Sequence, residues 1–348
     1  MIGTEAAYLE ACSLHRIGNP THGDSIELSK TELDIDNPEL RILLHKFFLS
    51  SFKNFEYHRF TFSDGNPDMN AVFRYAKDYF DNGTNLHLTS VQLASLLHER
   101  SSHPQIKPGD FFVASFSEIH YEGKAIRALG LFKSEQKQSF IKTLENGKNF
   151  ELLAEEGISP EKLDKACLIL DHEQEDGFRV LIIDQSNRGG EARYWRDEFL
   201  NLEVVKDEFH QTREFMNLTS DFVKLQLPEE FEVNKADQID LLNRSVDFFK
   251  KKEKFVKEEF EQEVLQDQGL ITSFQTFDEA YRQSRELDAF TEFEISSAAV
   301  KKQSKVFKSV LKLDKNFHIY IHGNKELIER GTDPDGRKYY KIYFEQES

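Results

Sequence analysis

The spacing of apolar residues in the first hundred positions predicts three helices. Residues 37–52 repeat apolar side chains at helical intervals, and Asn37-Pro38 is a favourable helix start. Residues 68–83 predict a second helix that ends at Asn82-Gly83. Thr89 or Ser90 can cap a third helix over residues 91–102.

Runs rich in β-branched and aromatic residues predict an antiparallel sheet in the same part of the chain. Residues 109–123 and 124–135 meet at Glu122-Gly123, which favours a hairpin, and residues 165–173 and 178–186 repeat this pattern. With the strand expected at residues 11–18, we expect a sheet of about five or six strands packed with helices. The interpretation is an α+β domain over residues 1–204.

The pattern changes after residue 201 to long, charged segments with helical apolar spacing. These helices are expected over residues 207–226, 233–267 and 276–290, with breaks at Pro228 and near Gly269. Three short alternating runs after residue 316 predict a small terminal β-meander. The second domain, residues 205–348, is therefore expected to be mainly helical, and the whole chain to be of the α+β class.

Composition narrows the class of protein. The chain has 348 residues, 39% of them hydrophobic and only 8 of them proline, which is typical of a folded globular protein. Cys12 and Cys167 form no metal-ligand spacing and are interpreted as buried thiols in a reducing compartment. No signal peptide or long apolar run is present, so we expect a cytoplasmic protein with no membrane partner.

The net charge of −17 is unevenly distributed. Residues 299–348 hold 11 Lys and Arg against 7 Asp and Glu, which gives about +4 for this tail and about −21 for the rest of the chain. Phosphate backbones are bound mainly through Lys and Arg. The tail is therefore the place to look for DNA contact.

A stripe of lysines is the most informative feature of the tail. If residues 297–315 form one helix, five lysines step by four, three, four and three residues along one side, opposite an apolar face. The alternative is the solvated face of a docked helix. The residues predicted to contact DNA are Lys301, Lys302, Lys305, Lys308, Lys312, Lys315, Lys325, Arg330, Arg337 and Lys338.

A second candidate surface surrounds the only tryptophan. Arginines beside aromatic residues suit a protein interface, and the alternative is a tryptophan that closes the core where sheet meets helix. The possible interface residues are Arg188, Arg193, Tyr194, Trp195 and Arg196. Exposed hairpin edges and this segment also make a homodimer a possible assembly.

The sequence contains none of the motifs that carry common enzyme mechanisms. It lacks the nucleophile elbow, the phosphate loop, the dinucleotide-binding glycines and the HExxH zinc motif. His318 and His322 share one face of a predicted strand, but no third ligand completes a metal site there. The expectation is a non-enzymatic protein without catalytic residues, cofactor or metal.

The order of these segments resembles the bacterial 37-kDa nucleoid-associated proteins, known as the NdpA family. The resemblance lies in residues 11–18, 77–118, 163–209 and 301–331 and covers most of the chain. It implies a nucleoid-localised protein that binds double-stranded DNA with little sequence preference, and it supplies no catalytic residues.

Two functions from different classes remain open on the sequence. The first is a nucleoid-associated protein that binds duplex DNA through its C-terminal lysines. The second is a protein-interaction module that docks on a DNA-bound partner or mimics DNA, because residues 231–267 form a long acidic stretch. A nuclease or hydrolase without a recognised motif is a third, weaker hypothesis.

Overall fold

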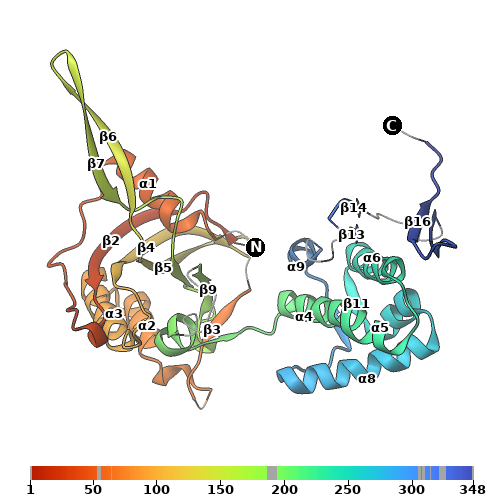
Figure 1. Ribbon diagram of the computed structural model, residues 1–348. Helices are drawn as coiled ribbons and strands as arrows, with labels where there is room; N and C mark the ends of the chain where they lie inside the picture. The colour runs from red at the N-terminus through yellow and green to blue at the C-terminus, as the bar shows by residue number, and fades with distance from the viewer. Residues whose placement is uncertain are drawn as a thin grey trace. The chain divides into compact units, whose positions relative to one another are not determined.

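The computed structural model divides the chain into two units, Met1–Val205 (unit 1) and Lys206–Ser348 (unit 2) (Figure 1). The residues that the structure describes are 2–52, 56–63, 65–185, 194–304, 307, 310–313, 315–320 and 327–346. Unit 1 is an antiparallel sheet packed with helices, and unit 2 is a helical body with two small terminal hairpins. The predicted fold class is confirmed.

Unit 1 begins with short strands and helices and continues with long strands. Its elements in chain order are β1 (Ile2–Gly3), β2 (Tyr8–Ile17), α1 (Pro38–Leu49), β3 (His58–Phe60), α2 (Ala71–Asn82), α3 (Leu86–Arg100), β4 (Gly109–Tyr121), β5 (Lys124–Ser134), β6 (Gln138–Asn146), β7 (Asn149–Gly157), β8 (Lys165–Leu170), β9 (Arg179–Asp184), the π-helix η5 (Tyr194–Leu200) and β10 (Leu202–Val204).

The main sheet has eight strands in the order β1-β4-β5-β8-β9-β3-β10, and β2 pairs with β4 beside β1. The hairpin predicted at Glu122-Gly123 is present, because both residues adopt positive φ (49° and 76°) and close a two-residue turn between β4 and β5. The predicted first helix is α1, where the Asn37 side chain accepts hydrogen bonds from two backbone N–H groups.

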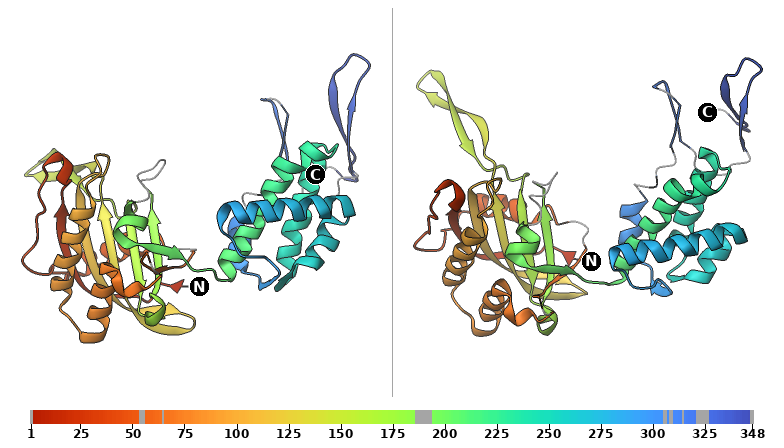
Figure 2. Two further views of the ribbon diagram at one scale, coloured as in Figure 1. Left: turned by 90° about the horizontal axis from the view of Figure 1, so that it is seen from below. Right: turned by 60° about the horizontal axis from the view of Figure 1, so that its bottom comes forward.

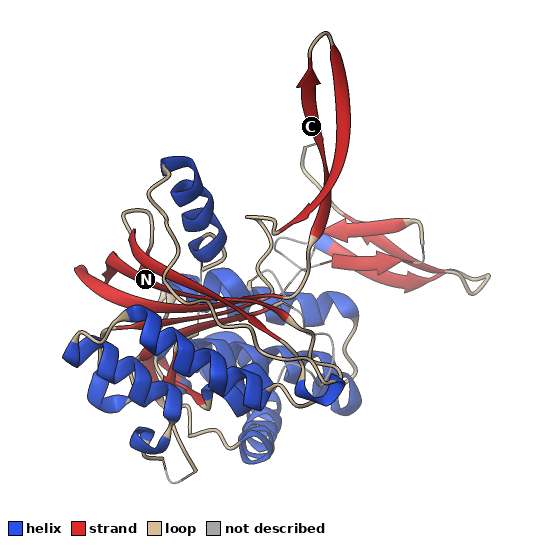
Figure 3. Cartoon of the chain, turned by 90° about the vertical axis from the view of Figure 1, so that its left-hand side faces the viewer, coloured by secondary structure: helices blue, strands red, loops and turns tan. Residues whose placement is uncertain are grey.

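Helices cover both faces of this sheet (Figure 3). On one face, α2, α3 and η5 pack against alternate strand residues such as Phe111 and Val113. On the other face, the last turn of α1 packs Phe47 and Phe48 against Phe112 and its neighbours. The two thiols, Cys12 and Cys167, are free and buried, as predicted.

Strands β6 and β7 form a separate two-stranded hairpin that extends beyond the sheet (Figure 1). We call residues 138–157 the arm. Its nine-residue strands pair from Gln138 with Gly157 to Asn146 with Asn149, and nearly all of its side chains are exposed.

Unit 2 is built from helices with two short strands between them. Its elements are α4 (Glu208–Asp221), the π-helix η6 (Phe222–Gln226), α5 (Leu227–Glu230), α6 (Lys235–Lys251), β11 (Lys254–Val256), α7 (Lys257–Phe260), the π-helix η7 (Glu261–Leu265), α8 (Gln268–Arg285), β12 (Glu292–Glu294), α9 (Ser297–Gln303), β13 (Val310–Leu313), β14 (Phe317–Tyr320), β15 (Ile328–Thr332) and β16 (Lys338–Ile342).

Phenylalanines fill the core of unit 2. Phe215 of α4 lies at its centre, with the rings of Phe255 and Phe260 at centroid distances of 4.3 and 5.0 Å. Phe255 also stacks on Phe293 at 4.5 Å, and this contact pairs β11 with β12. The single helix predicted over residues 233–267 is therefore wrong, because α6 ends at Lys251 and long-range pairing holds residues 254–256 as a strand.

The terminal strands form two separate hairpins, β13–β14 and β15–β16, which project from the helices of unit 2 (Figure 2). A small apolar cluster at their base joins them to the helical body. It contains Ile239 of α6 and Leu311 of β13, with Ile328 and Tyr340 packed against them.

Candidate nucleic-acid interface

Helix α9 presents the first two lysines of the predicted DNA-binding set. The Ser296 hydroxyl accepts a hydrogen bond from the Ala299 N–H and caps the helix. Ala299 and Val300 are buried where α9 packs on α4 and α6, whereas Lys301 and Lys302 are exposed. The Lys302 ammonium lies 5.8 Å from the centre of the Phe209 ring on α4.

The lysine stripe does not continue along this helix. α9 ends at Gln303, Lys312 lies on β13 and Lys315 lies in the turn that follows β13. The helical interpretation of residues 297–315 is therefore wrong. Leu311 and Leu313 alternate with polar residues at a spacing of two, and pairing with β14 and contact with Ile239 fix them as a strand. Lys305 and Lys308 lie outside the described residues.

The first terminal hairpin separates apolar from basic side chains. Leu311 pairs with Ile319 and Lys312 with His318, so the two pairs lie on opposite faces. Leu311 is 3% exposed and belongs to the apolar cluster with Ile239, whereas Lys312 and His318 are exposed. One face therefore anchors the hairpin and the other carries positive charge to the solvent.

The second terminal hairpin carries three further members of the set. Arg330 pairs with Tyr340, and Lys338 pairs with Thr332 next to the turn. The Asp333 carboxylate accepts hydrogen bonds from two backbone N–H groups of the turn, one of them from Arg337. Arg330, Arg337 and Lys338 are exposed. Lys325 lies outside the described residues.

Within the described part of the chain, these basic side chains have no acidic partner, which distinguishes them in so acidic a protein. Among the described residues, no carboxylate lies within 4.0 Å of any of seven exposed basic groups. The seven are Lys301, Lys302, Lys312, Lys315, Arg330, Arg337 and Lys338. By contrast, Lys341 of β16 lies 3.8 Å from a Glu329 carboxylate oxygen. Unpaired cations can bind an external anion without first breaking an ion pair.

A hollow beside α9 adds residues that sequence reasoning missed. It has a volume of about 590 Å³, and its charged lining consists of Lys250 of α6, Lys252 just past the end of α6, Lys301 of α9, Glu253 and Glu294. Lys252 bonds to Glu259 and Glu263 at 2.9 and 2.8 Å, and these bonds raise its pKa. The run of three lysines at 250–252 signalled this charge, but it lay within the stretch interpreted as acidic.

The chain matches the model of the family NA37, described as nucleoid-associated protein YejK, over residues 13–337. The chain belongs to this family. A comparison with curated proteins found no match.

The family match spans the main sheet from the second half of β2 onward, the arm, the helical body and the terminal strands up to β15, and it leaves out β1 and β16. Six of the seven exposed basic residues lie within the matched range, and the exception is Lys338. The matched residues therefore include most of the fold and nearly all of the candidate interface.

The second surface predicted for this family member is corrected in part. Tyr194 and Trp195 are 4% and 0% exposed, and the Trp195 indole N–H donates to the Ala166 carbonyl oxygen at 3.2 Å. Both aromatic side chains lie in the core, where η5 packs on the sheet, so they form no interface. Arg196 pairs with the adjacent Asp197. Arg188 and Arg193 lie outside the described residues.

A buried group of charges underlies Tyr194. The Lys133 ammonium donates to the Lys107 carbonyl at 2.7 Å, to a Glu135 carboxylate oxygen at 3.0 Å and to the Tyr194 hydroxyl at 3.1 Å. Burial lowers the pKa of Lys133, and the Glu135 charge opposes that effect. Lys165 bonds to Asp184 at 2.9 Å beside it. These contacts tie the ends of β5, β8 and β9 to η5.

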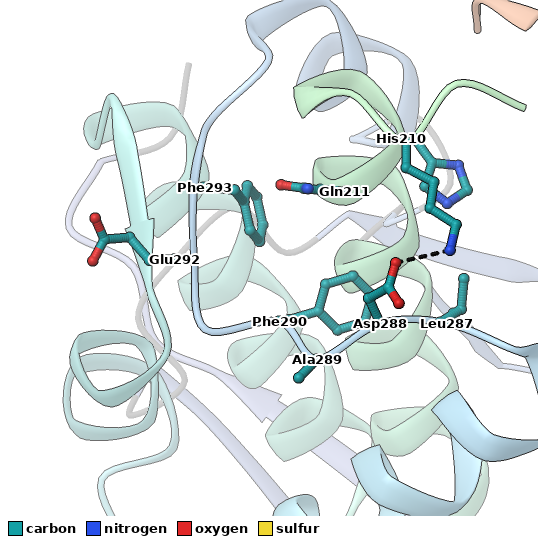
Figure 4. Close-up of a pocket in the computed structure, with 9 residues that line it drawn as sticks. His210, Gln211, Leu287, Asp288, Ala289, Phe290, Glu292 and Phe293 are labelled. Carbon is teal, nitrogen blue, oxygen red and sulfur yellow. Dashed lines mark hydrogen bonds and ion pairs between the residues drawn. The ribbon is translucent and has the colours of Figure 1, made fainter.

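A hollow beside α4 is too small for a nucleotide. His210 and Gln211 face the segment 287–293, and the Lys206 ammonium bonds to Asp288 at 2.8 Å (Figure 4). Its volume of about 40 Å³ is close to that of a single water molecule.

The described part of the chain holds neither a metal-binding cluster nor a membrane-spanning helix. No group of three or more His, Cys, Asp or Glu side chains there can hold a metal ion. No helix there is long and apolar enough to cross a bilayer.

Proposed function

We propose that this chain is a non-enzymatic protein of the bacterial nucleoid, in the cytoplasm, and that it binds double-stranded DNA with little sequence preference. Membership of the NA37 family supports the nucleoid-associated role. The observation that supports DNA binding is the set of seven exposed basic side chains on α9 and the two terminal hairpins, which have no acidic partner among the residues that the structure describes.

The arrangement of this set favours contact with phosphates over reading of bases. Lysine ammonium groups act as point charges that position a protein on the duplex without reading sequence. The described basic residues are spread over α9 and two narrow hairpins, and α9 has only seven residues, which is short for a helix that reads bases in a major groove. Affinity should therefore depend on charge and vary little with base sequence.

A titration with a fluorescent duplex at low salt tests this proposal. In the full chain, Lys301→Glu, Lys302→Glu and Lys312→Glu together should weaken binding at least about tenfold, because three cations become anions. A matched control changes three exposed lysines of unit 1, Lys30, Lys107 and Lys124, to Glu, and it should leave affinity within about twofold. Equal losses in both variants, or no binding by the wild type, would contradict the proposal.

The second candidate function is docking on a DNA-bound protein. The charge of about −21 outside the tail favours a basic protein partner over a duplex for that part of the chain. In a pull-down, the tagged full chain would retain a protein from nuclease-treated lysate. That result, together with no duplex binding by the pure chain, would replace direct DNA contact with docking on a DNA-bound protein.

A further inference from the structure

The two terminal hairpins, which project from the helices of unit 2 (Figure 2), expose aromatic side chains as well as cations. In the second hairpin, Tyr339, Tyr343 and Phe344 are 48%, 39% and 70% exposed. In the first hairpin, Phe317 and Tyr320 are each 63% exposed. A group of large exposed apolar side chains marks a binding surface, and contact with phosphates does not require aromatic rings.

Alternation along β16 and beyond its end places Tyr339, Lys341 and Tyr343 on one face of the second hairpin. The Tyr343 N–H donates to the Leu327 carbonyl oxygen at 2.8 Å, so strand pairing continues as far as this residue. The Lys341 ammonium lies 4.6 Å from the centre of the Tyr343 ring. Tyr340 points the other way and packs on the apolar cluster at the base of the hairpin. The face with Tyr339 is therefore the outward face.

A glycine opposite Tyr339 sets the position of its ring. Tyr339 pairs with Gly331, and a Cβ atom at Gly331 would overlap the phenol end of the Tyr339 ring. The ring therefore lies across the backbone of β15, while 48% of the residue remains exposed. An aromatic ring that is already held in place loses little conformational freedom when a flat partner stacks on it.

The first hairpin shows the same separation of its two faces. Lys312 pairs with His318, and Val310 pairs with Tyr320 two positions away, so Lys312, His318 and Tyr320 share one face. Leu311 on the opposite face is buried in the apolar cluster. Each hairpin therefore turns one face to the helices and carries a tyrosine and a lysine on its outward face.

Exposed aromatic rings beside cations suit an unpaired nucleic-acid strand. The flat faces of the bases in a duplex are stacked on one another, whereas a single strand exposes them to aromatic side chains. Stacking tolerates any base, and Lys and Arg hold the phosphates between the bases. The described residues of the two hairpins hold six Lys and Arg against four Asp and Glu in a chain of net charge −17, which favours a polyanion as the occupant.

We propose that the outward faces of the two terminal hairpins bind single-stranded DNA, with Tyr339 and Tyr343 as the rings on which unpaired bases stack. This inference rests on the proposed DNA binding and specifies a form of DNA that the hairpins prefer, an unpaired strand that adjoins a duplex. The basic residues contact the phosphates of either form, whereas the two tyrosines contact only unpaired bases.

Fluorescence anisotropy titrations of the full chain with three DNA probes test this inference. The probes are a blunt duplex, an oligothymidine strand and the same duplex with an oligothymidine tail. The wild type should bind the oligothymidine, and it should bind the tailed duplex at least about tenfold more tightly than the blunt duplex. Tyr339→Ala with Tyr343→Ala should abolish the preference for the tail and leave the affinity for the blunt duplex within about twofold, because phosphate contacts remain.

Three further variants separate stacking from a change in the hairpin itself. Tyr339→Phe with Tyr343→Phe keeps both rings and should keep the preference for the tail. Gly331→Ala displaces the Tyr339 ring without removing an aromatic or charged group, and it should weaken oligothymidine binding about fivefold or more. Phe62→Ala, which removes a 37% exposed ring of unit 1, should bind all three probes as the wild type does.

The outcomes distinguish this inference from the DNA binding on which it rests. A wild type that binds the blunt duplex but neither the oligothymidine nor the tail would overturn the inference and leave duplex binding intact. Equal losses for all three probes in the double alanine variant would also overturn it, because the tyrosines would then act through the structure of the hairpin. A wild type that binds none of the probes would contradict both proposals.

Discussion

His15 is a buried histidine whose surroundings hold it neutral. The Ser29 backbone N–H donates to its Nδ1 at 3.2 Å, so the ring proton resides on Nε2 and is donated to the Ser90 hydroxyl at 2.8 Å. Burial, with the nearby His87 ring as a smaller cause, lowers the pKa of His15 to about 4. The unfolded chain therefore binds a proton there at mildly acidic pH that the folded chain does not bind.

This difference predicts a loss of stability in mild acid. Because the folded pKa lies below the unfolded value, the contribution is present above about pH 6.5 and is lost as the pH falls toward 4. Between pH 7 and pH 5 the unfolding free energy of unit 1 should fall by about 2 kcal/mol from this residue. Urea denaturation at both pH values measures it. His15→Gln should remove most of the fall, and an equal fall in that variant would exclude His15 as its cause.

Lys133 predicts a second effect at the residue scale. Lys133→Met leaves Glu135 buried without its closest cation and should lower the unfolding free energy by roughly 3 kcal/mol. Adding Glu135→Leu should restore part of the loss, as measured by a double-mutant cycle in urea. If the two effects simply add, the buried pair has no coupling, contrary to this interpretation.

At the scale of elements, local sequence patterns predicted the helix starts and turns whose stabilising contacts are close in sequence. The Asn37-Pro38 start of α1 and the Glu122-Gly123 turn of β4–β5 are local signals, and both are present. Strand β13 was mistaken for helix because Lys301 to Lys315 also fits a helical repeat, whereas its strand form depends on β14 and on Ile239. The arm was overlooked, although Asn146-Gly147 is a strong hairpin signal.

The candidate site shows the same limit. The exposed basic residues of the tail followed from charge counting, whereas their placement on two hairpins did not. Lys250 joins Lys301 only because α6 and α9 pack together, and no local pattern contains that contact. Trp195 was ambiguous for the same reason, since its core position depends on the Ala166 carbonyl of β8.

A prediction at this scale concerns the anchor of the first terminal hairpin. Leu311→Ala removes the buried side chain that joins β13 to α6 and should destabilise the hairpin locally by about 2–3 kcal/mol. Amide hydrogen exchange should then accelerate in β13 and β14, while amides in α6 and α8 keep their protection. Faster exchange throughout unit 2, or none in the hairpin, would contradict a local anchor.

At the scale of the whole molecule, the chain carries its positive and negative charge in different places. The chain outside residues 299–348 carries a charge of about −21, which opposes contact with a duplex. The proposed DNA binding therefore rests on the cations of α9 and the terminal hairpins that have no acidic partner among the described residues. The central claim is therefore that these few side chains displace counterions from DNA.

The most direct test is the salt dependence of duplex binding by the full chain. Affinity is measured at several salt concentrations for the wild type and for the chain with Lys301→Gln, Lys302→Gln and Lys312→Gln. If each lysine contacts one phosphate, the three substitutions together should make the slope of log K against log salt shallower by about 3. An unchanged slope, or no binding by the wild type at low salt, would contradict the claim.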